Sequence, residues 1–238
     1  MLGSGMATAP PKAPPQRRTS YHHGNLRAAM IEAAVRLIEE KGADAVTVRE
    51  VARQAGVSSG APFRHFASRK ALMTAVAEEA MARLRSEIEG RLAGVAGDDP
   101  IAGLLALADA YVDWAVDNPT HYRVLGDRVL VDFYRSEALV RDNRWIRETM
   151  LALFAAAEER GLLRDCDIGL VAFQCRAMAY GLARMHVDAH LQEFGIPAEQ
   201  ARAAMTNALR EFLIGLVRDP DAARQAAAIG SSTSKQAP

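Results

Sequence analysis

The sequence predicts an all-α protein with a small N-terminal three-helix domain and a larger C-terminal helical domain. Apolar residues recur along most of the chain with the three- and four-residue spacing of a buried helix face. No segment alternates apolar and polar residues between hairpin turns, as strands do. Half of the 238 residues are apolar and 6% are aromatic, which is enough for the cores of one or two ordinary domains.

The chain begins with a segment that we expect to be disordered. Residues 1–20 are rich in proline and contain Arg17 and Arg18, so they predict a flexible basic arm. A first helix is expected from Asn25, and Gly42 is its expected C-cap. Six apolar positions share one face of this helix: Leu26, Met30, Ala33, Ala34, Leu37 and Ile38.

Two short helices are expected next. Thr47 is the predicted N-cap of the second helix, and Glu50 completes a capping box in which each side chain bonds the other residue's amide. Gly56 ends this helix. Ser58 then offers another N-cap, for a third helix over about Ser59–Phe66.

Ser68 is the expected N-cap of a fourth helix that runs to about Gly94. Two short helices joined by a glycine-containing turn are typical of a helix-turn-helix, and an ordinary helical hairpin has the same spacing. We expect the N-terminal domain to span residues 21–68, the C-terminal domain residues 69–222, and a flexible tail residues 223–238. Long helical patterns in the C-terminal domain are broken at Asp98–Pro100, Asn118–Pro119, near Gly161 and at Gly195–Pro197.

The charges are distributed unevenly although the chain is neutral overall. Residues 1–73 hold 11 Lys or Arg and 5 Asp or Glu, a net charge of +6, and the remaining residues hold 18 and 24, a net charge of −6. A polyanion such as nucleic acid should therefore bind the first third of the chain.

Several classes of protein are disfavoured. No apolar run is long enough to span a membrane, and the Pro-rich start lacks the pattern of a secretory signal. The two cysteines, Cys166 and Cys175, form neither a disulfide framework nor a metal pattern. We expect a cytoplasmic protein that has no cofactor and does not associate with a membrane.

Two further motifs carry little weight. Gly56–Gly60 matches the G-x-S-x-G nucleophile elbow of hydrolases, but that elbow needs a preceding strand and a sheet, so we do not expect an enzyme. His186 and His190 have the spacing of a metal pair on a helix, but no third ligand accompanies them. A polar helix end is the preferred interpretation, and no metal site is expected.

The stretch from Thr47 to Leu72 closely resembles the DNA-binding signature of the TetR family of bacterial repressors. It combines a Thr-led second helix, Gly56–Ser58, aromatic Phe63 and Phe66 around His65, and a Ser68-Arg69 helix start. Three later features and the N-terminal segment 21–26 are similar to the subgroup with a WHG-type C-terminal domain: Trp114, Asn118–Tyr122 and Tyr180–Leu182. The resemblance implies a homodimeric repressor in which a ligand in the C-terminal domain changes the spacing of the two DNA-binding domains.

The candidate DNA contacts begin at the second helix. Thr47 and Ser58 stand where helices begin, so their hydroxyls and the nearby amides can bind phosphate. Arg49 is long enough to reach a phosphate or a guanine edge. The first turn of the recognition helix contains only small residues, which let the backbone approach the major groove closely: Ser59, Gly60 and Ala61.

The other candidate contacts include departures from the family pattern. Ser59 and Arg69 each replace a frequent Lys, and Arg69 should keep a phosphate contact. Phe63 replaces a frequent Tyr, which removes one phosphate hydrogen bond worth about 1 kcal/mol. His65 either contacts phosphate or packs beside Phe66 as a partly buried ring. The arm bearing Arg17 and Arg18 either enters a minor groove or adds charge without specificity.

The C-terminal domain offers fewer signals. Two helices, Asp167–His190 and one after Ala201, are apolar enough to form a four-helix dimer interface. In this apolar setting Arg176 anchors an acidic ligand or bridges the dimer to a carboxylate. Five aromatic residues either line a ligand cavity or belong to the core: Trp114, Tyr122, Phe133, Phe154 and Phe173.

Together these observations predict a homodimeric repressor that binds a palindromic operator in double-stranded DNA and is released by a small-molecule effector. A mainly apolar effector is mildly preferred, because no ring of charged residues stands out. The alternative is a helix-turn-helix protein that is controlled by a protein partner or has no effector.

Overall fold

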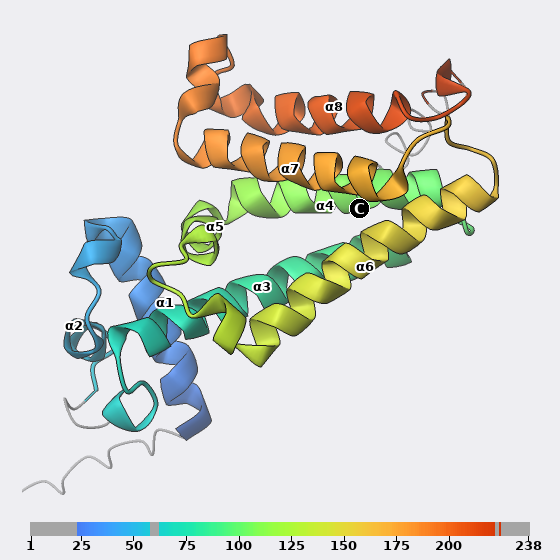
Figure 1. Ribbon diagram of the computed structural model, residues 1–238. Helices are drawn as coiled ribbons and strands as arrows, with labels where there is room; N and C mark the ends of the chain where they lie inside the picture. Colours follow the sequence, from blue (N-terminus) through green and yellow to red (C-terminus); the bar gives the residue numbers. More distant parts are fainter. Residues whose placement is uncertain (1–22, 58–61, 222–223, 225–238) are drawn as a thin grey trace, which may run out of the picture.

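The computed structural model describes residues 23–57, 62–221 and 224. This part of the chain contains eight α-helices, several short 3₁₀ turns and one isolated β-bridge between Leu163 and Val217, but no strand. A small head that contains α1 and α2 lies at one end of a larger helical body (Figure 1). The predicted all-α fold with two unequal parts is confirmed.

The head is built around α1 (His23–Lys41). All six apolar residues predicted for one face of this helix are buried. The chain then passes through η1 (Ala43–Ala45) into α2 (Val48–Gln54). Gly42 and Gly56 follow the two helices with φ of +81° and +69°, a backbone region that favours glycine, so both predicted helix ends are confirmed.

Two local expectations for the head need correction. Thr47 caps α2 through its hydroxyl, which accepts a hydrogen bond from the Glu50 amide at 3.1 Å. The Glu50 carboxylate does not return to Thr47, because it binds Arg53 and Lys41 instead, so only half of the capping box forms. In the described part of the predicted third helix, the chain makes one 3₁₀ turn, η2 (Pro62–Arg64), before Phe66 turns into the core.

Helix α3 (Arg69–Ala93) belongs to both parts of the molecule. It begins at Ser68, whose hydroxyl accepts the Ala71 amide at 3.0 Å, and ends at Gly94, as predicted. Its first turns pack against the head, and the rest packs against α4 (Pro100–Asp117) and α6 (Glu137–Glu159) (Figure 1). A movement of α3 relative to the body therefore moves the head.

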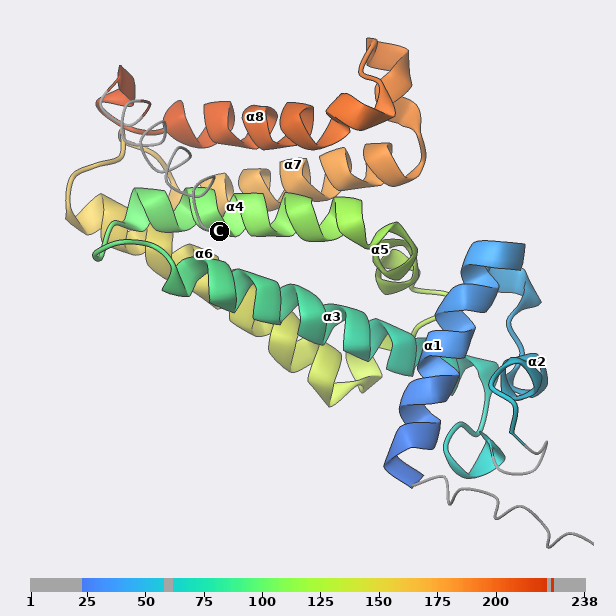
Figure 2. The same cartoon turned by 180° about the vertical axis from the view of Figure 1, so that it is seen from behind.

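The remaining helices complete the body. Figure 2 shows α4 beside α7 (Ile168–Val187) and α8 (Ala201–Ile214), with α5 (Pro119–Gly126) between them and α1. The four predicted interruptions of the C-terminal helices all occur. A further break, the loop 127–136 with its 3₁₀ turn η3 (Phe133–Arg135), was not predicted. Two other 3₁₀ turns join α7 to α8: η4 (His190–Phe194) and η5 (Ala198–Gln200).

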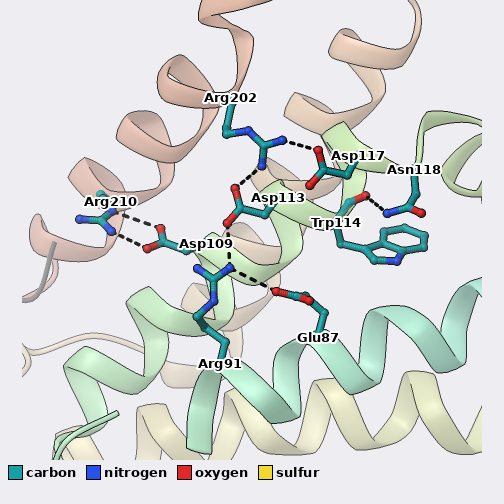
Figure 3. Close-up of polar contacts among 9 residues, drawn as sticks. All are labelled: Glu87, Arg91, Asp109, Asp113, Trp114, Asp117, Asn118, Arg202 and Arg210. Atoms are coloured by element: carbon teal, nitrogen blue, oxygen red, sulfur yellow. Dashed lines mark hydrogen bonds and ion pairs between the residues drawn. The ribbon is translucent and has the colours of Figure 1, made fainter. Parts of the chain in front are cut away.

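A row of carboxylates on α4 fixes α3 and α8 to it (Figure 3). Asp113 accepts hydrogen bonds from Arg91 of α3 at 2.9 Å and from Arg202 of α8 at 2.5 Å. Asp109 pairs with Arg210, and Asp117 with Arg202. Because these aspartates recur every four residues, they occupy one face of α4 and leave another face for the interior of the body.

A second carboxylate ties α6 to α3. The side chain of Asp142 is buried and accepts hydrogen bonds from Arg85 at 2.9 Å and from Arg141 at 2.8 Å. The Arg85 guanidinium also lies 4.8 Å from the ring centre of Trp145. The contacts of Arg85, which belongs to α3, with Asp142 and Trp145 of α6 hold the two long helices of the body together.

None of the helices in the described ranges is long and apolar enough to cross a membrane. The same residues hold no group of three or more His, Cys, Asp or Glu side chains placed to bind a metal ion.

Candidate functional site

The start of α2 presents a free cationic side chain. Thr47 and Arg49 are both exposed there. In the described part of the chain, Arg49 has neither a hydrogen-bond acceptor nor a carboxylate partner, so its guanidinium is available to a ligand. Helix amides and an adjacent cation form an arrangement that binds phosphate.

The next arginine on α2, Arg53, is paired with a carboxylate, unlike Arg49. Arg53 donates two hydrogen bonds to the Glu50 carboxylate, at 3.0 and 2.7 Å. Hydrogen bonding from Arg53, aided by the charge of Lys41, lowers the pKa of Glu50 to about 2. The charge of Arg53 is therefore neutralised within the head, whereas that of Arg49 is not.

The η2 turn places further candidate contacts at the surface. The ring of Phe63 is 47% exposed, and Arg64 and His65 are exposed as well. His65 also lies beside Phe66, with the ring centres 6.5 Å apart and the rings tilted by 51°. His65 thus lies beside Phe66 but is exposed, so it is not a partly buried ring, and its phosphate contact stays a prediction. Four predicted contacts lie outside the described residues: Ser58, Ser59, Gly60 and Ala61.

Arg69 has an internal role that was not foreseen. Its guanidinium donates a hydrogen bond to the Ala43 carbonyl at 2.8 Å and lies 3.6 Å from Asp44. These contacts join the start of α3 to the turn before α2, so the side chain is partly engaged within the head. The phosphate contact expected of Arg69 would have to use its remaining N–H groups.

The body contains a cavity of about 100 Å³ between α3, α4, α5, α6 and α7. Three of the five predicted aromatic residues line it, namely Trp114, Tyr122 and Phe133. Sixteen other residues complete the lining: Met81, Leu84, Leu107, Ala108, Tyr111, Leu125, Gly126, Arg128, Asn143, Ile146, Met150, Cys175, Arg176, Ala179, Tyr180 and Leu209.

The ligand contacts predicted at Phe154 and Phe173 and the buried setting predicted for Arg176 need correction, and for Phe154 the alternative of a core residue is the one that holds. Phe154 is completely buried in the core and does not line the cavity, and Phe173 is 69% exposed on the outer side of α7. Arg176 does line the cavity, but its side chain is exposed and not buried among apolar residues. The reason is that α7 buries only the face that carries Val171, Ala172 and Cys175.

Tyr122 lines the cavity together with two tyrosines that the sequence did not single out as ligand contacts, Tyr111 and Tyr180. The Tyr111 hydroxyl donates to the Tyr122 hydroxyl at 3.4 Å, and the Tyr122 hydroxyl donates to the Tyr180 carbonyl at 3.0 Å. Burial raises the pKa of both Tyr111 and Tyr122, so both are neutral at pH 7. Tyr111 could have been recognised from the sequence as a cavity residue, because it lies three residues before Trp114 and so on the same face of the helix.

The loop 127–136 contacts both the cavity and the head. Arg128, which lines the cavity, lies 3.7 Å from the ring centre of Phe133. A few residues on, Asp132 pairs with Lys70 at 2.6 Å, and its amide donates to the Thr74 hydroxyl at 3.0 Å. Lys70 and Thr74 belong to the first turns of α3, which carry the head.

The same loop is joined to α1. Ser136, the N-cap of α6, donates to the Glu78 carboxylate at 2.8 Å, and Glu78 pairs with Arg27 of α1 at 3.2 Å. The loop was missed from the sequence, although Gly126-Asp127 marks its start. The Asp127 carboxylate accepts the amides of Val129 and Leu130 at 2.8 and 2.9 Å, which turns the chain.

The outer face of α7 exposes large apolar side chains. Leu170, Phe173 and Tyr180 are 53%, 69% and 47% exposed. Their spacing of three and seven residues places them on one side of the helix, with the exposed Ala177 between them. An exposed apolar face of this kind is typical of a protein–protein contact.

A short helix with an exposed cation at its start, a turn after it and a separate helical body with a cavity form the arrangement expected of a helix-turn-helix transcriptional regulator. The model for "Bacterial regulatory proteins, tetR family" matches residues 30–76, and that for "Tetracyclin repressor-like, C-terminal domain" matches residues 104–212. The chain therefore belongs to the TetR family of DNA-binding transcriptional regulators, which are not enzymes.

Individual proteins agree with this assignment. The HTH-type transcriptional regulator BetI of Cronobacter sakazakii is 27% identical over 197 residues, which are 79% of this chain and 91% of that protein. A protein of unknown function from Rhodococcus sp. RHA1 aligns with a TM-score of 0.67 and 26% identity, over 84% of this chain and all of that one. A tetR-family regulator from Rhodococcus RHA1 shares the fold, with a TM-score of 0.64 and 19% identity over 79% and 95% of the two chains.

Proposed function

We propose that the protein is a homodimeric, ligand-responsive repressor that works in the cytoplasm. Each head binds one half of a palindromic operator, and a small molecule in the cavity of the body releases the DNA. The observation that carries this proposal is the loop 127–136, which contacts the cavity through Arg128 and Phe133 and the head through Lys70 and Thr74.

The DNA-binding part rests on the exposed groups of the head. Arg49 and His65 are free to approach a phosphate, and the N-terminal third of the chain carries a net charge of +6. Two heads related by twofold symmetry would read half-sites about 34–36 Å apart, one helical turn of DNA.

The dimer part rests on the apolar outer face of α7. Association would bury Leu170, Phe173 and Tyr180 of both copies, and these residues are too exposed to be explained by packing within one chain. Neighbouring α8 is held firmly to α4 by Arg202 and Arg210, so it offers a rigid second helix for a four-helix contact.

The effector part rests on population shift. A ligand that binds better when the loop 127–136 is displaced would favour a different placement of α3 and hence of the head. A tenfold loss of DNA affinity requires only about 1.4 kcal/mol of coupling. The presence of a cavity favours this mechanism over control by a protein partner, for which no cavity is needed.

The proposal is tested by fluorescence anisotropy with duplexes tiled across the DNA that flanks the gene of this protein. We expect tight binding to one pseudo-palindromic tile, with an affinity that falls steeply as the salt concentration rises. Equal, weak binding to every tile would contradict specific repression at this locus. A monomer in sedimentation at concentrations where the tile binds would contradict the dimer.

A further inference from the structure

The charged side chains that line the cavity are all positive. Both charged residues of the lining, Arg128 and Arg176, are arginines, and no Asp or Glu lines the cavity. Most of the remaining lining is aliphatic or aromatic. The cavity therefore combines an apolar interior with positive charge.

Neither of these two arginines is neutralised. Arg176 donates one hydrogen bond, at 2.7 Å, to the side-chain oxygen of Asn143, which carries no charge. Arg128 donates to the Leu125 carbonyl at 3.2 Å and stacks on Phe133. Among the described residues, neither guanidinium pairs with a carboxylate. By contrast, Arg202, which braces α8, contacts two carboxylates.

A buried hydrogen-bond donor in the lining also lacks a partner. The indole N–H of Trp114 is inaccessible to solvent and has no acceptor. An unpaired buried donor is costly, but a ligand can reach this N–H only where the side chains that cover it move aside. The accessible charges of Arg128 and Arg176 therefore carry the argument for the chemistry of the ligand.

We propose that the cavity binds a small organic acid, with its carboxylate on Arg176 and its apolar body among the aliphatic and aromatic side chains. This inference rests on the proposed effector function and specifies the chemical class of the effector. Arg176 has a planar guanidinium with N–H groups to spare, which suits a carboxylate. A cationic ligand would instead place its charge near two guanidinium groups.

The test uses two series of probes that share a body and differ in charge. The first is phenylacetate, phenylacetamide and phenethylamine, and the second is hexanoate, hexanamide and hexylamine. Binding to the DNA-free protein is followed through the indole N–H signals of ¹⁵N-labelled protein. The chain has two tryptophans, so Trp114 reports on the cavity and Trp145, assigned with Trp145→Phe, serves as the internal reference.

We expect each carboxylate to shift the Trp114 signal and to bind about tenfold or more tightly than its amide, because a hydrogen bond to a charged group is lost in the amide. The amine should bind most weakly. Arg176→Gln should reduce the difference between acid and amide to less than about threefold, and Arg176→Lys should retain part of it. Arg147→Gln is the matched control, because Arg147 is exposed on α6 and pairs only with Glu148 in the described chain.

The inference is overturned if amide and acid bind equally in both series, if the amine binds best, or if no probe shifts the Trp114 signal. Because the measurement contains no DNA, these outcomes are separate from failure of the repressor function. A carboxylate that binds through Arg176 but never weakens operator binding would leave the site standing and remove its role as effector site.

Discussion

Removing the free charge at the start of α2 should weaken DNA binding in a way that salt reveals. The change is Arg49→Gln, which keeps most of the side-chain stem. Arg49 is exposed and has no partner in the described residues, so its whole charge is available to a phosphate. Arg36→Gln is the matched control, because it removes the same charge from α1, where Glu32 lies 3.8 Å away.

The expected magnitude follows from one phosphate interaction in each of the two heads of the proposed dimer. Removing one such interaction lowers the slope of log affinity against log salt by about 0.9, so the two heads together should lower it by about 1.8. A solvent-exposed ion pair of this kind contributes about 1 kcal/mol. The dimer therefore binds DNA more weakly by about 2 kcal/mol, or about thirtyfold in affinity. Arg36→Gln should cost much less, because its charge is already compensated by Glu32.

The assay is fluorescence anisotropy with a duplex of arbitrary sequence over a range of salt concentrations. Any duplex serves, because a phosphate contact does not depend on sequence. An unchanged salt slope for folded Arg49→Gln would refute the phosphate role. A loss confined to the operator, with normal binding to arbitrary DNA, would show that Arg49 reads a base edge instead.

Three further changes test other parts of the molecule. Phe63→Tyr should tighten binding to arbitrary DNA a few-fold, because the ring is 47% exposed and the new hydroxyl can donate to phosphate; equal or weaker binding would mean that the ring does not face the DNA backbone. Asp142→Asn should lower the free energy of unfolding in urea by about 1.5–3 kcal/mol, since two arginines lose a charged acceptor. Hydrogen bonding from Arg141 lowers the pKa of Asp142 in the folded state. The difference in free energy of unfolding between the unchanged protein and Asp142→Asn should therefore be full above about pH 4 and shrink as the pH falls below it. A difference that persists at low pH would contradict the role of the ionised Asp142 carboxylate. Phe173→Glu should convert the proposed dimer to monomer in sedimentation, whereas Tyr134→Glu, at an even more exposed ring on η3, should not.

Local chemistry explains why much of the fold could be predicted. The Thr47 and Ser68 caps and the Gly42 and Gly56 ends depend on a few neighbouring residues, so they can be recognised without knowledge of the tertiary structure. The reciprocal half of the capping box failed because Glu50 is within reach of Arg53 and Lys41, and a charged donor competes well with an amide.

The residues that line the cavity were harder to predict, because they depend on how each helix is rotated about its axis relative to its neighbours. Phe154 and Phe173 lie on helices with apolar residues on several sides, and helical spacing alone does not say which side meets the cavity. In the structure, Phe154 is buried in the core and Phe173 is exposed. Trp114, Tyr122 and Phe133, which do line the cavity, were proposed on the same ground as these two, namely aromatic character on a helical segment.

The contacts that join the cavity to the head also limit how strongly a single residue can control the response. The Lys70–Asp132 pair is almost half exposed on both sides, and the Arg27–Glu78 pair is also solvent-accessible, so each contributes about 1 kcal/mol or less. A tenfold response needs about 1.4 kcal/mol, which is more than one such contact supplies and within the upper bound of about 2 kcal/mol for the two together. If the loop 127–136 transmits the effector signal, substitutions at Lys70 or Glu78 should therefore weaken induction without abolishing it, and only their combination should uncouple the cavity from the head.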